Sequence, residues 1–499
     1  MPQIQNFLLD RDKPLIKINK DLMSFIDQFV KQKELLKLFN WISAKTKISE
    51  NTLKVDSKIF IFRKFINLKG RFDKCFEIKK LFFDSIKFMM IFFYIRFFSK
   101  KINKTIDCEL IVDGITPFAK PERFEKISKL CDTIFVSSIK LNKIYKTFIF
   151  NKYKNCVISK EVCNNYYFFI VLFFKIFFAS LKIRTNLFPL VIRLILNYLK
   201  YETIFSTIKS KFLIQERFYD TSEIKNEIFH KHGGKLTSVI QKNPLSGLSA
   251  ALTSQVFHMG TYIHSDILFT LGHKSSESIE EMEGNIKSLI PVGSLFMERD
   301  FFDRKESNNF PSFDLLVFTS NHQTESHSGY NLYYSDYYPQ FEWIKRFSNE
   351  FPNLKIGLKD KKTWERIDSK IRKIFKGVKN VEFLLDKSKE WTDSYFLGAK
   401  AKALCTSISC LGFEFIGYGK ECYYLDPGGR GAGYVSKKNE SLSFVRITNY
   451  NDFKRKILDS ISGKRDEQIL KSRENFCLYS DNVSENILKS LRDLENKNL

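Results

Sequence analysis

The chain has 499 residues, a length that suits two or three domains rather than one. Hydrophobic residues make up 43% and charged residues 27% of it, which excludes wholesale disorder, and 11 prolines and 21 glycines are too few for a collagen-like or linker-dominated chain. Residues 1–210 hold 39 basic against 18 acidic side chains, whereas the remainder holds 42 against 38. A basic module therefore precedes a nearly neutral one, and a basic surface favours polyanions.

Residues 1–105 are expected to form a basic helical region. Ile18–Phe39 has apolar residues at helical spacing, and the basic cluster Lys100–Lys104 closes the region. The N-terminus lacks a basic segment followed by an apolar core, so no secretory signal is expected. Nine cysteines without a CxxC pair indicate reduced thiols of a cytoplasmic protein. The sequence lacks the clustered ligands that a zinc site needs, so no metal site is expected, and no bound cofactor is expected.

A first Rossmann-like domain is expected over 106–295. The apolar runs 108–114 and 133–138 indicate buried strands, and 121–131 between them indicates a helix opened by Pro121. Strand, helix and strand at this length form a βαβ unit. Further strands or strand edges are expected at 236–241, 261–272 and 288–293.

A Phe-rich helical insertion, 160–205, interrupts this domain. A spanning helix needs about 20 mostly apolar residues, whereas the longest uninterrupted apolar run here is Tyr166–Phe174, and 81–98 offers only Phe88–Ile95. Neither segment therefore predicts a clean transmembrane span. Pro189 indicates that the insertion is two helices rather than one.

Most charges of the insertion fall into two pairs, each seven residues apart: Lys175 with Lys182, and Arg193 with Lys200. Seven residues return to the same helix face within about 20°. Arg184 departs from this pattern. Each helix would have one basic stripe and a broad apolar face, as in a helix that lies in a membrane interface. Two core helices with a solvated stripe are the alternative that the sequence leaves open.

A polar linker is expected at 296–312, and a second Rossmann-like domain at 313–499. Its strands are expected at 313–320, 354–359, 381–385, 401–407, 421–427 and 441–447, and its helices at 338–351, 363–375, 390–399, 410–420, 450–462 and 481–494. This alternation predicts a doubly wound parallel sheet, whose ligands bind at the carboxyl ends of the strands. The expected fold class is therefore α/β, with two such domains.

Candidate catalytic residues lie in the first domain. His232, in the sequence His-Gly-Gly-Lys, is a candidate base for an acceptor hydroxyl, because a histidine pKa lies near working pH. Asp113, after the strand 108–112, and Asp266, within 261–272, are the carboxylate candidates for the same task. A metal role for the histidines is not supported, since their spacing matches no metal motif.

The stretch 406–420 carries the most informative pattern for ligand binding. It is expected where a strand ends and a helix begins, where free backbone N–H groups favour an anion. Ser407 and Ser409 add hydroxyl donors, and Gly412 permits close approach to a ligand or a neighbouring strand. Glu414 could accept hydrogen bonds from two ribose hydroxyls.

This stretch resembles the donor-nucleotide site of GT-B glycosyltransferases, and within them bacterial surface-carbohydrate and capsular polysaccharide biosynthesis proteins. The resemblance covers roughly 107–490 and is most specific in 400–427. It implies that Glu414 binds the donor ribose and that the loop before it binds the phosphates. Alternatively, Gly412 and Glu414 terminate and solvate a helix of some other α/β fold.

Further donor-binding candidates lie in two loops and at one strand end. The loop after 313–320 holds Ser320 and His322, and Lys359 ends the strand 354–359. In the glycine-rich loop 428–433, Arg430 could bind a phosphate through two hydrogen bonds. A solvated loop without a role is the alternative for each.

The expected function is that of a metal-independent glycosyltransferase. It would move a sugar from a nucleotide-sugar donor to a lipid-linked or polysaccharide acceptor, at the inner face of the cytoplasmic membrane, with anionic lipid as a partner. Transfer of a polyol phosphate from a CDP-linked donor in the same fold is one alternative. A non-catalytic membrane- or nucleic-acid-binding protein is another, but solid Phe runs are unlike RNA-binding aromatics, so no nucleic-acid partner is expected.

Overall fold

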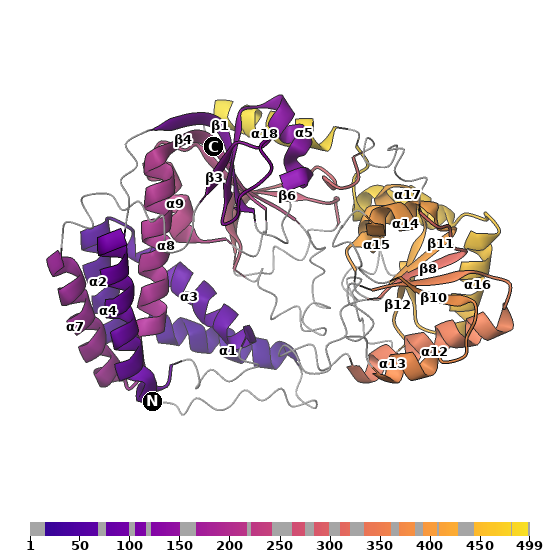
Figure 1. Cartoon of the computed structure of the whole chain (residues 1–499), viewed down its shortest axis with the longest axis horizontal. Helices are drawn as coiled ribbons and strands as arrows, with labels where there is room; N and C mark the ends of the chain where they lie inside the picture. Colours follow the sequence, from indigo (N-terminus) through magenta and orange to yellow (C-terminus); the bar gives the residue numbers. More distant parts are fainter. Residues whose placement is uncertain are drawn as a thin grey trace.

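The computed structural model of the chain describes residues 15–67, 76–98, 105–115, 121–149, 166–216, 221–241, 262–274, 284–298, 310–319, 334–360, 369–384, 393–406, 409–427, 444–480 and 482–497. Figure 1 shows two lobes side by side, each built around one sheet.

The first lobe is built on a seven-stranded parallel sheet in the order β3-β2-β1-β4-β5-β6-β7. Its strands are β1 (Ile106–Ile115), β2 (Thr133–Ser137), β3 (Thr147–Ile149), β4 (Ile208–Gln215), β5 (Leu236–Ile240), β6 (His264–Thr270) and β7 (Asn285–Pro291). The order of the first six is that of a Rossmann fold, with a switch point between β1 and β4. The expected βαβ unit is confirmed, whereas β4 and β3 had no prediction.

Both faces of this sheet are covered, as the alternation of side chains along β1 requires. Ile111 packs into a large helical core, and Leu110 and Val112 pack into a smaller core on the opposite face. The helices of the larger core are α1 (Leu15–Val30), α2 (Lys33–Thr46), α3 (Glu50–Asn67), α4 (Leu81–Phe98), α7 (Tyr166–Ile183), α8 (Phe188–Thr207) and α9 (Glu223–Lys231). The short helices η3 (Pro121–Phe124) and α5 (Glu125–Leu130) contribute to the smaller one.

The insertion divides into two helices with different environments. Pro189 stands in the first turn of α8, which confirms the predicted break. Helix α8 is mostly buried, so the core alternative applies to it. Helix α7 packs beside α2 and α4 but leaves Phe174 and Phe178 more than half exposed. None of the helices among the described residues combines the length and the apolarity that crossing a membrane requires.

The second lobe repeats the Rossmann strand order in a six-stranded parallel sheet, β10-β9-β8-β11-β12-β13. Its strands are β8 (Leu315–Phe318), β9 (Ile356–Lys359), β10 (Val381–Leu384), β11 (Ala403–Thr406), β12 (Cys422–Leu425) and β13 (Arg446–Ile447). Helices α12 (Tyr334–Glu350), α13 (Ser369–Ile374) and α16 (Tyr450–Ile461) form one layer, and α14 (Asp393–Lys400), α15 (Leu411–Gly417) and α17 (Glu467–Phe476) form the other. The predicted doubly wound sheet is confirmed, with β8 and β11 at its switch point.

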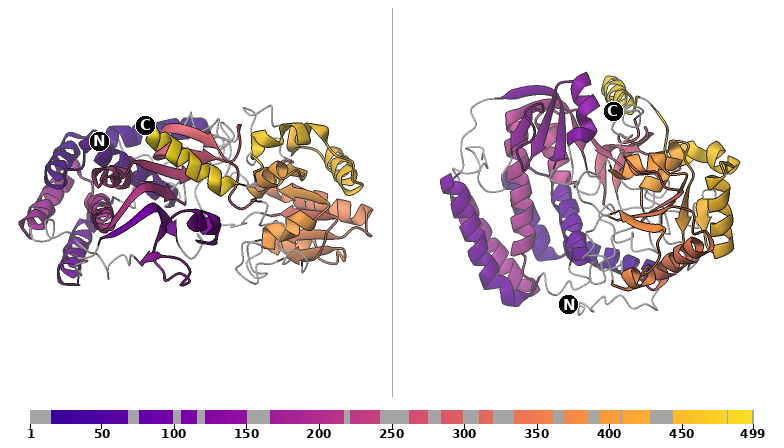
Figure 2. Two further views of the ribbon diagram at one scale, coloured as in Figure 1. Left: turned by 90° about the horizontal axis from the view of Figure 1, so that it is seen from above. Right: turned by 45° about the vertical axis from the view of Figure 1, so that its right-hand side comes forward.

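The last helix, α18 (Val483–Asn496), returns to the first lobe. Its side chains Val483, Ile487, Leu488 and Leu491 are buried in the smaller core of the first sheet. Figure 2 shows α18 lying across that lobe when the molecule is seen from above. The second domain was expected to extend over all of 313–499, but α18, at the end of this range, packs on the first sheet instead. Two Rossmann-like lobes and a returning last helix give the chain a GT-B-like α/β fold.

Candidate active site

At the switch point of the first sheet, Asp113 near the end of β1 lies beside two cations. Its carboxylate oxygens are 3.7 Å from Nζ of Lys200 on α8 and 3.8 Å from Nζ of Lys225 on α9. Burial opposes ionisation of Asp113, but the two ammonium groups outweigh it and lower the pKa of the carboxyl below its ordinary value. The buried group is therefore a carboxylate, suited to accepting a hydrogen bond from a hydroxyl.

A second charged pair lies at the same edge of the sheet. Glu216, directly after β4, is 2.5 Å from Nη1 of Arg123 in η3. The guanidinium of Arg123 also lies over the ring of Phe296, 3.6 Å from its centroid. Phe296 follows β7, so three connections that leave the carboxyl edge of this sheet meet at Arg123.

The other two catalytic candidates lie at the opposite edge. His232 follows α9, just before β5 begins, and its Nε2 is 3.0 Å from Oε1 of Glu202. Asp266 is the third residue of β6 and lies 3.0 Å from Nε2 of His230. Both therefore stand at the amino ends of strands, and the structure brings neither to Asp113.

In the second lobe, polar side chains end the strands on both sides of the switch point. Thr319 directly follows β8, and its hydroxyl donates to Asp360, which directly follows β9, at 2.8 Å. Thr406 ends β11; its hydroxyl donates to the carbonyl of Phe318 at 3.0 Å and accepts from the backbone N–H of Ser409 at 3.1 Å. All these groups lie at the carboxyl edge, where a doubly wound sheet binds its ligand.

Glu414, in the first turns of α15, is buried and joined to two other segments. One carboxyl oxygen accepts from Ser294 at 2.6 Å and the other from Tyr395 at 2.9 Å. Ser294 follows β7 of the first lobe, and Tyr395 stands at the start of α14 in the second. Burial, and after it the nearby Glu414, raises the pKa of Tyr395 well above its ordinary value, so its hydroxyl remains a donor. Glu414 therefore ties the lobes together in this structure.

Two more predicted donor residues have structural partners. A Cβ on Gly412 would lie 2.4 Å from the hydroxyl oxygen of Tyr424 on β12, so this glycine serves close packing of α15 on a neighbouring strand. The Ser409 hydroxyl accepts from the N–H of Leu411 at 3.3 Å. Lys359 stands at the end of β9, as expected, with its side chain buried. Ser320, His322, Ser407 and Arg430 lie outside the described residues.

A continuous series of contacts links the carboxyl edges of the two sheets. It runs from Glu216 through Arg123 to Phe296, whose ring stacks on Tyr395 with centroids 5.4 Å apart, and from Tyr395 to Glu414. Two parallel sheets whose ligand-binding edges meet can hold one reactant on each and bring them together.

Several of these residues had no prediction from sequence. Thr319 and Thr406 share a signal that sequence could have offered, because each is the first polar residue at or directly after the end of a buried strand. Asp360 and Glu216 follow strands that already end in a polar residue, Lys359 and Gln215. Ser294 and Tyr395 offer no such signal, because their role depends on the approach of two lobes.

Among the described residues, no three His, Cys, Asp or Glu side chains gather as a metal site would require.

No protein-family model matches the chain, and no curated protein does. Similar solved structures include UDP-GlcNAc 2-epimerase from Neisseria meningitidis bound to UDP-GlcNAc, at 10% identity and a TM-score of 0.46, covering 78% of this chain and 100% of that one. The S. aureus MnaA–UDP co-structure is similar at 10% identity and a TM-score of 0.44, covering 78% and 96%. The wall teichoic acid polymerase TagF with CDPG is similar at 10% identity and a TM-score of 0.44, covering 84% and 96%. The fold assignment rests on the strand orders and helix α18.

Proposed function

We propose that this chain is a glycosyltransferase that moves a sugar from a nucleotide-sugar donor to a lipid-linked or polysaccharide acceptor in cell-surface carbohydrate biosynthesis. The observation that supports it most is the meeting of two Rossmann-type carboxyl edges through Arg123, Phe296, Tyr395 and Glu414. Each edge has polar groups at its switch point, so one reactant can occupy each lobe.

The donor is assigned to the second lobe, at the ends of β8, β9 and β11. Thr319, Asp360, Thr406 and Ser409 offer hydroxyl, carboxylate and backbone groups there. Glu414 is buried between Ser294 and Tyr395, so for it to accept from ribose hydroxyls, as the resemblance implies, the packing around its carboxyl group has to open. Donor binding through Glu414 would therefore be coupled to the relative position of the lobes.

The acceptor is assigned to the switch point of the first lobe. Of the three candidate bases, Asp113 alone lies at the carboxyl edge, and we assign it the acceptor hydroxyl. Lys200 and Lys225 keep this carboxylate ionised and can attract a phosphorylated acceptor. Because its pKa is lowered, Asp113 is better suited to orienting a hydroxyl than to removing its proton fully.

We assign the exposed apolar side chains of α4 and α7 to the surface of an anionic membrane, at its inner face. Phe82, Phe83 and Tyr167 are 73–75% exposed, and Lys175 and Lys182 of α7 are exposed among the apolar residues. Aromatic side chains beside lysines are the chemistry that binds the acyl boundary and its phosphates.

The donor assignment is tested by thermal shift against UDP-, GDP-, CMP-, CDP- and dTDP-linked donors, since a ligand of the folded state raises the unfolding temperature. We expect a shift with one nucleotide class, lost in Asp360→Asn and kept in Asp314→Asn, which changes a carboxylate at the amino edge of the same sheet. A shift only with a CDP-linked polyol would replace sugar transfer by polyol-phosphate transfer. No shift with any donor would contradict the proposal.

The membrane assignment is tested by pelleting with anionic vesicles. Phe83→Gln combined with Phe178→Gln should release the protein, whereas Ile144→Gln, which changes a 70% exposed side chain elsewhere, should not. Equal pelleting of all variants would refute the assignment, and retardation of RNA in place of pelleting would favour the nucleic-acid alternative.

A further inference from the structure

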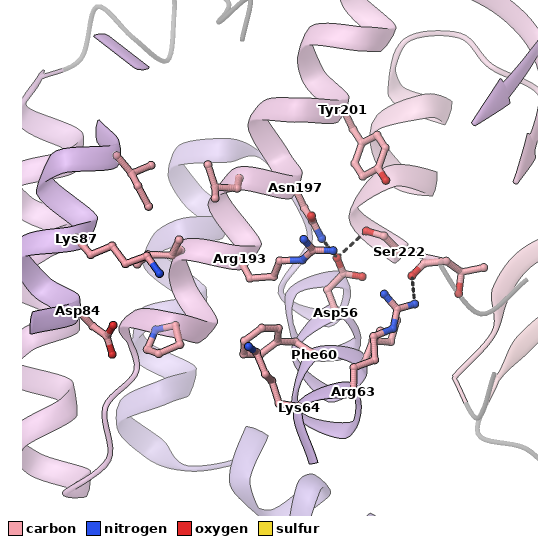
Figure 3. A pocket seen from close by; sticks show the side chains of 16 residues that line it. Asp56, Phe60, Arg63, Lys64, Asp84, Lys87, Arg193, Asn197, Tyr201 and Ser222 are labelled. Carbon is pink, nitrogen blue, oxygen red and sulfur yellow. Dashed lines mark hydrogen bonds between the residues drawn. The ribbon is translucent and has the colours of Figure 1, made fainter. Parts of the chain in front are cut away.

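A pocket of about 350 Å³ opens between α3, α4 and α8. Figure 3 shows Lys87 entering it from α4, Arg193 from α8, and Arg63 and Lys64 from α3. Two carboxylates, Asp56 and Asp84, also line it. The pocket thus gathers four cations and two acids in the helical part of the first lobe.

The two carboxylates are engaged by other groups. Asp56 accepts from the Ser222 hydroxyl and the N–H of Glu223, both at 2.7 Å, and Asp84 accepts from Asn186 at 2.7 Å. In the described part of the chain, no carboxylate forms an ion pair with Lys64, Lys87 or Arg193. The positive charge of the pocket therefore remains available to an anion.

The pocket also has an apolar wall, formed by Ile59, Phe60, Ile91, Pro189, Ile192 and Leu196, and its uncharged polar lining residues are Asn197, Tyr201, Thr221 and Ser222. A purely ionic ligand, such as free phosphate, would leave this wall without a partner. A ligand that is anionic at one end and apolar at the other satisfies both parts.

The pocket also adjoins an exposed apolar surface. Lys87 has Phe83 four residues before it and Met90 three residues after it, so helical geometry places both next to it. Phe83 is 75% and Met90 67% exposed. The apolar part of a ligand whose anion sits in the pocket can therefore continue along the outer face of α4.

At its other end the pocket reaches the candidate acceptor site. Tyr201 lines the pocket, and its hydroxyl helps to lower the pKa of the Asp113 carboxyl. Arg193 and Tyr201 stand eight residues apart on α8, so an anion held by Arg193 and Lys64 would lie about 12 Å along the helix from the residue that neighbours Asp113.

We propose that this pocket binds the phosphate or diphosphate group of an amphipathic ester, with its first carbons on the apolar wall. Phosphate is suited to arginine and lysine together, because guanidinium donates two parallel hydrogen bonds and ammonium adds a point charge. As the place of a lipid-linked acceptor the pocket rests on the proposed function; as a binding site for such esters it does not.

The test is isothermal titration of the full-length protein with octyl phosphate, inorganic phosphate and octanol. We expect octyl phosphate to bind at least about tenfold more tightly than inorganic phosphate, the gain that burial of roughly two methylenes supplies, and more tightly than octanol, which lacks the anionic group. Equal affinity for inorganic phosphate would reduce the site to one for the free anion and overturn the proposal, as would the absence of octyl phosphate binding.

Variants locate the binding. Lys64→Gln combined with Arg193→Gln should weaken octyl phosphate binding by at least about tenfold, since each removes a charged hydrogen-bond donor. Lys129→Gln combined with Lys146→Gln removes the same charge from exposed positions elsewhere in the first lobe and should leave affinity within about twofold. Unchanged binding in the pocket variant would overturn the proposal. If that variant does not fold, by circular dichroism, Lys87→Gln on the solvent side of α4 replaces it.

The same proteins separate this inference from the proposed function. Nucleotide donors should still raise the unfolding temperature of the pocket variant, because their site lies in the other lobe. Octyl phosphate binding without any donor shift would uphold the pocket and refute the transferase. A rise of the unfolding temperature with a nucleotide donor, without octyl phosphate binding, would uphold the transferase and refute the pocket.

Discussion

The buried carboxyl group of Glu414 joins the two lobes through two hydroxyl donors, so removing either donor should destabilise the contact between them. Ser294 donates at 2.6 Å and Tyr395 at 2.9 Å, and all three side chains are at least 94% buried. Ser294→Ala or Tyr395→Phe removes one donor from a buried acceptor, which costs about 1–3 kcal/mol. Tyr395→Phe keeps the ring that stacks on Phe296, so its effect isolates the hydroxyl.

The assay is thermal unfolding of each single variant and of the double variant. For a lobe of this size, each kcal/mol lowers the unfolding temperature by about 2–4 °C. Because both donors serve one carboxyl group, the double variant should depart from the sum of the singles by about 0.5–3 kcal/mol.

Tyr167→Phe is the matched control, since it removes a hydroxyl from a tyrosine that is 75% exposed on α7. It should change stability by less than about 0.5 kcal/mol. Loss of stability in Tyr395→Phe no larger than in this control, together with additive single effects, would refute the view that Glu414 ties the lobes together.

Two further predictions concern stability. Gly293→Ala should lower the free energy of unfolding by at least about 2 kcal/mol, measured by thermal unfolding, because Gly293 has a φ of +95° and a Cβ there would lie 2.4 Å from the carbonyl oxygen of Leu478. The control Gly377→Ala, with a φ of +83° and nothing within 4 Å of a Cβ, should lower it by only about 1–2 kcal/mol. Equal losses in the two variants would show that the contact with Leu478 is unimportant. Burial, followed by the charge of Lys58, lowers the pKa of His264 to about 4, so the folded state binds fewer protons than the unfolded state between about pH 4 and 6.5. The stability due to neutral His264 should therefore be lost as pH falls through that window, by about 3 kcal/mol in the free energy of urea unfolding. His264→Gln should flatten the dependence of this free energy on pH. An unchanged slope in the variant would contradict the buried neutral state.

The alternation of the second half of the chain determined its sheet. Short apolar runs such as 403–406 and 422–425 are buried on both sides, which is the signature of parallel strands, and turn or helix signals separate them. The pattern of 108–138 determined the first βαβ unit for the same reason. Pro189 marked the break between α7 and α8, because proline disrupts a helix interior.

The placement of the site residues was decided by tertiary structure. His232 and Asp113 were both candidate bases in sequence. His232 follows a helix and Asp113 lies near the end of a strand, so the parallel sheet places them at opposite edges. Similarly, the stripe of Arg193 and Lys200 has the spacing of a lipid-facing surface. Packing of α8 against α3 and the sheet instead turns Arg193 to a pocket and Lys200 to Asp113.

What sequence determined about this protein is local: which segments form strands and helices, and that they alternate as in two Rossmann-like domains. Periodicity and turn chemistry act over a few residues, so they can be recognised without the fold. Tertiary structure alone decided that α18 returns to the first lobe and that Ser294, Tyr395 and Glu414 meet. Ser294 and Glu414 are 120 positions apart, and Arg492 of α18 is 383 positions from its partner Glu109, so the energy of these contacts exists only after both sheets have formed and approached each other.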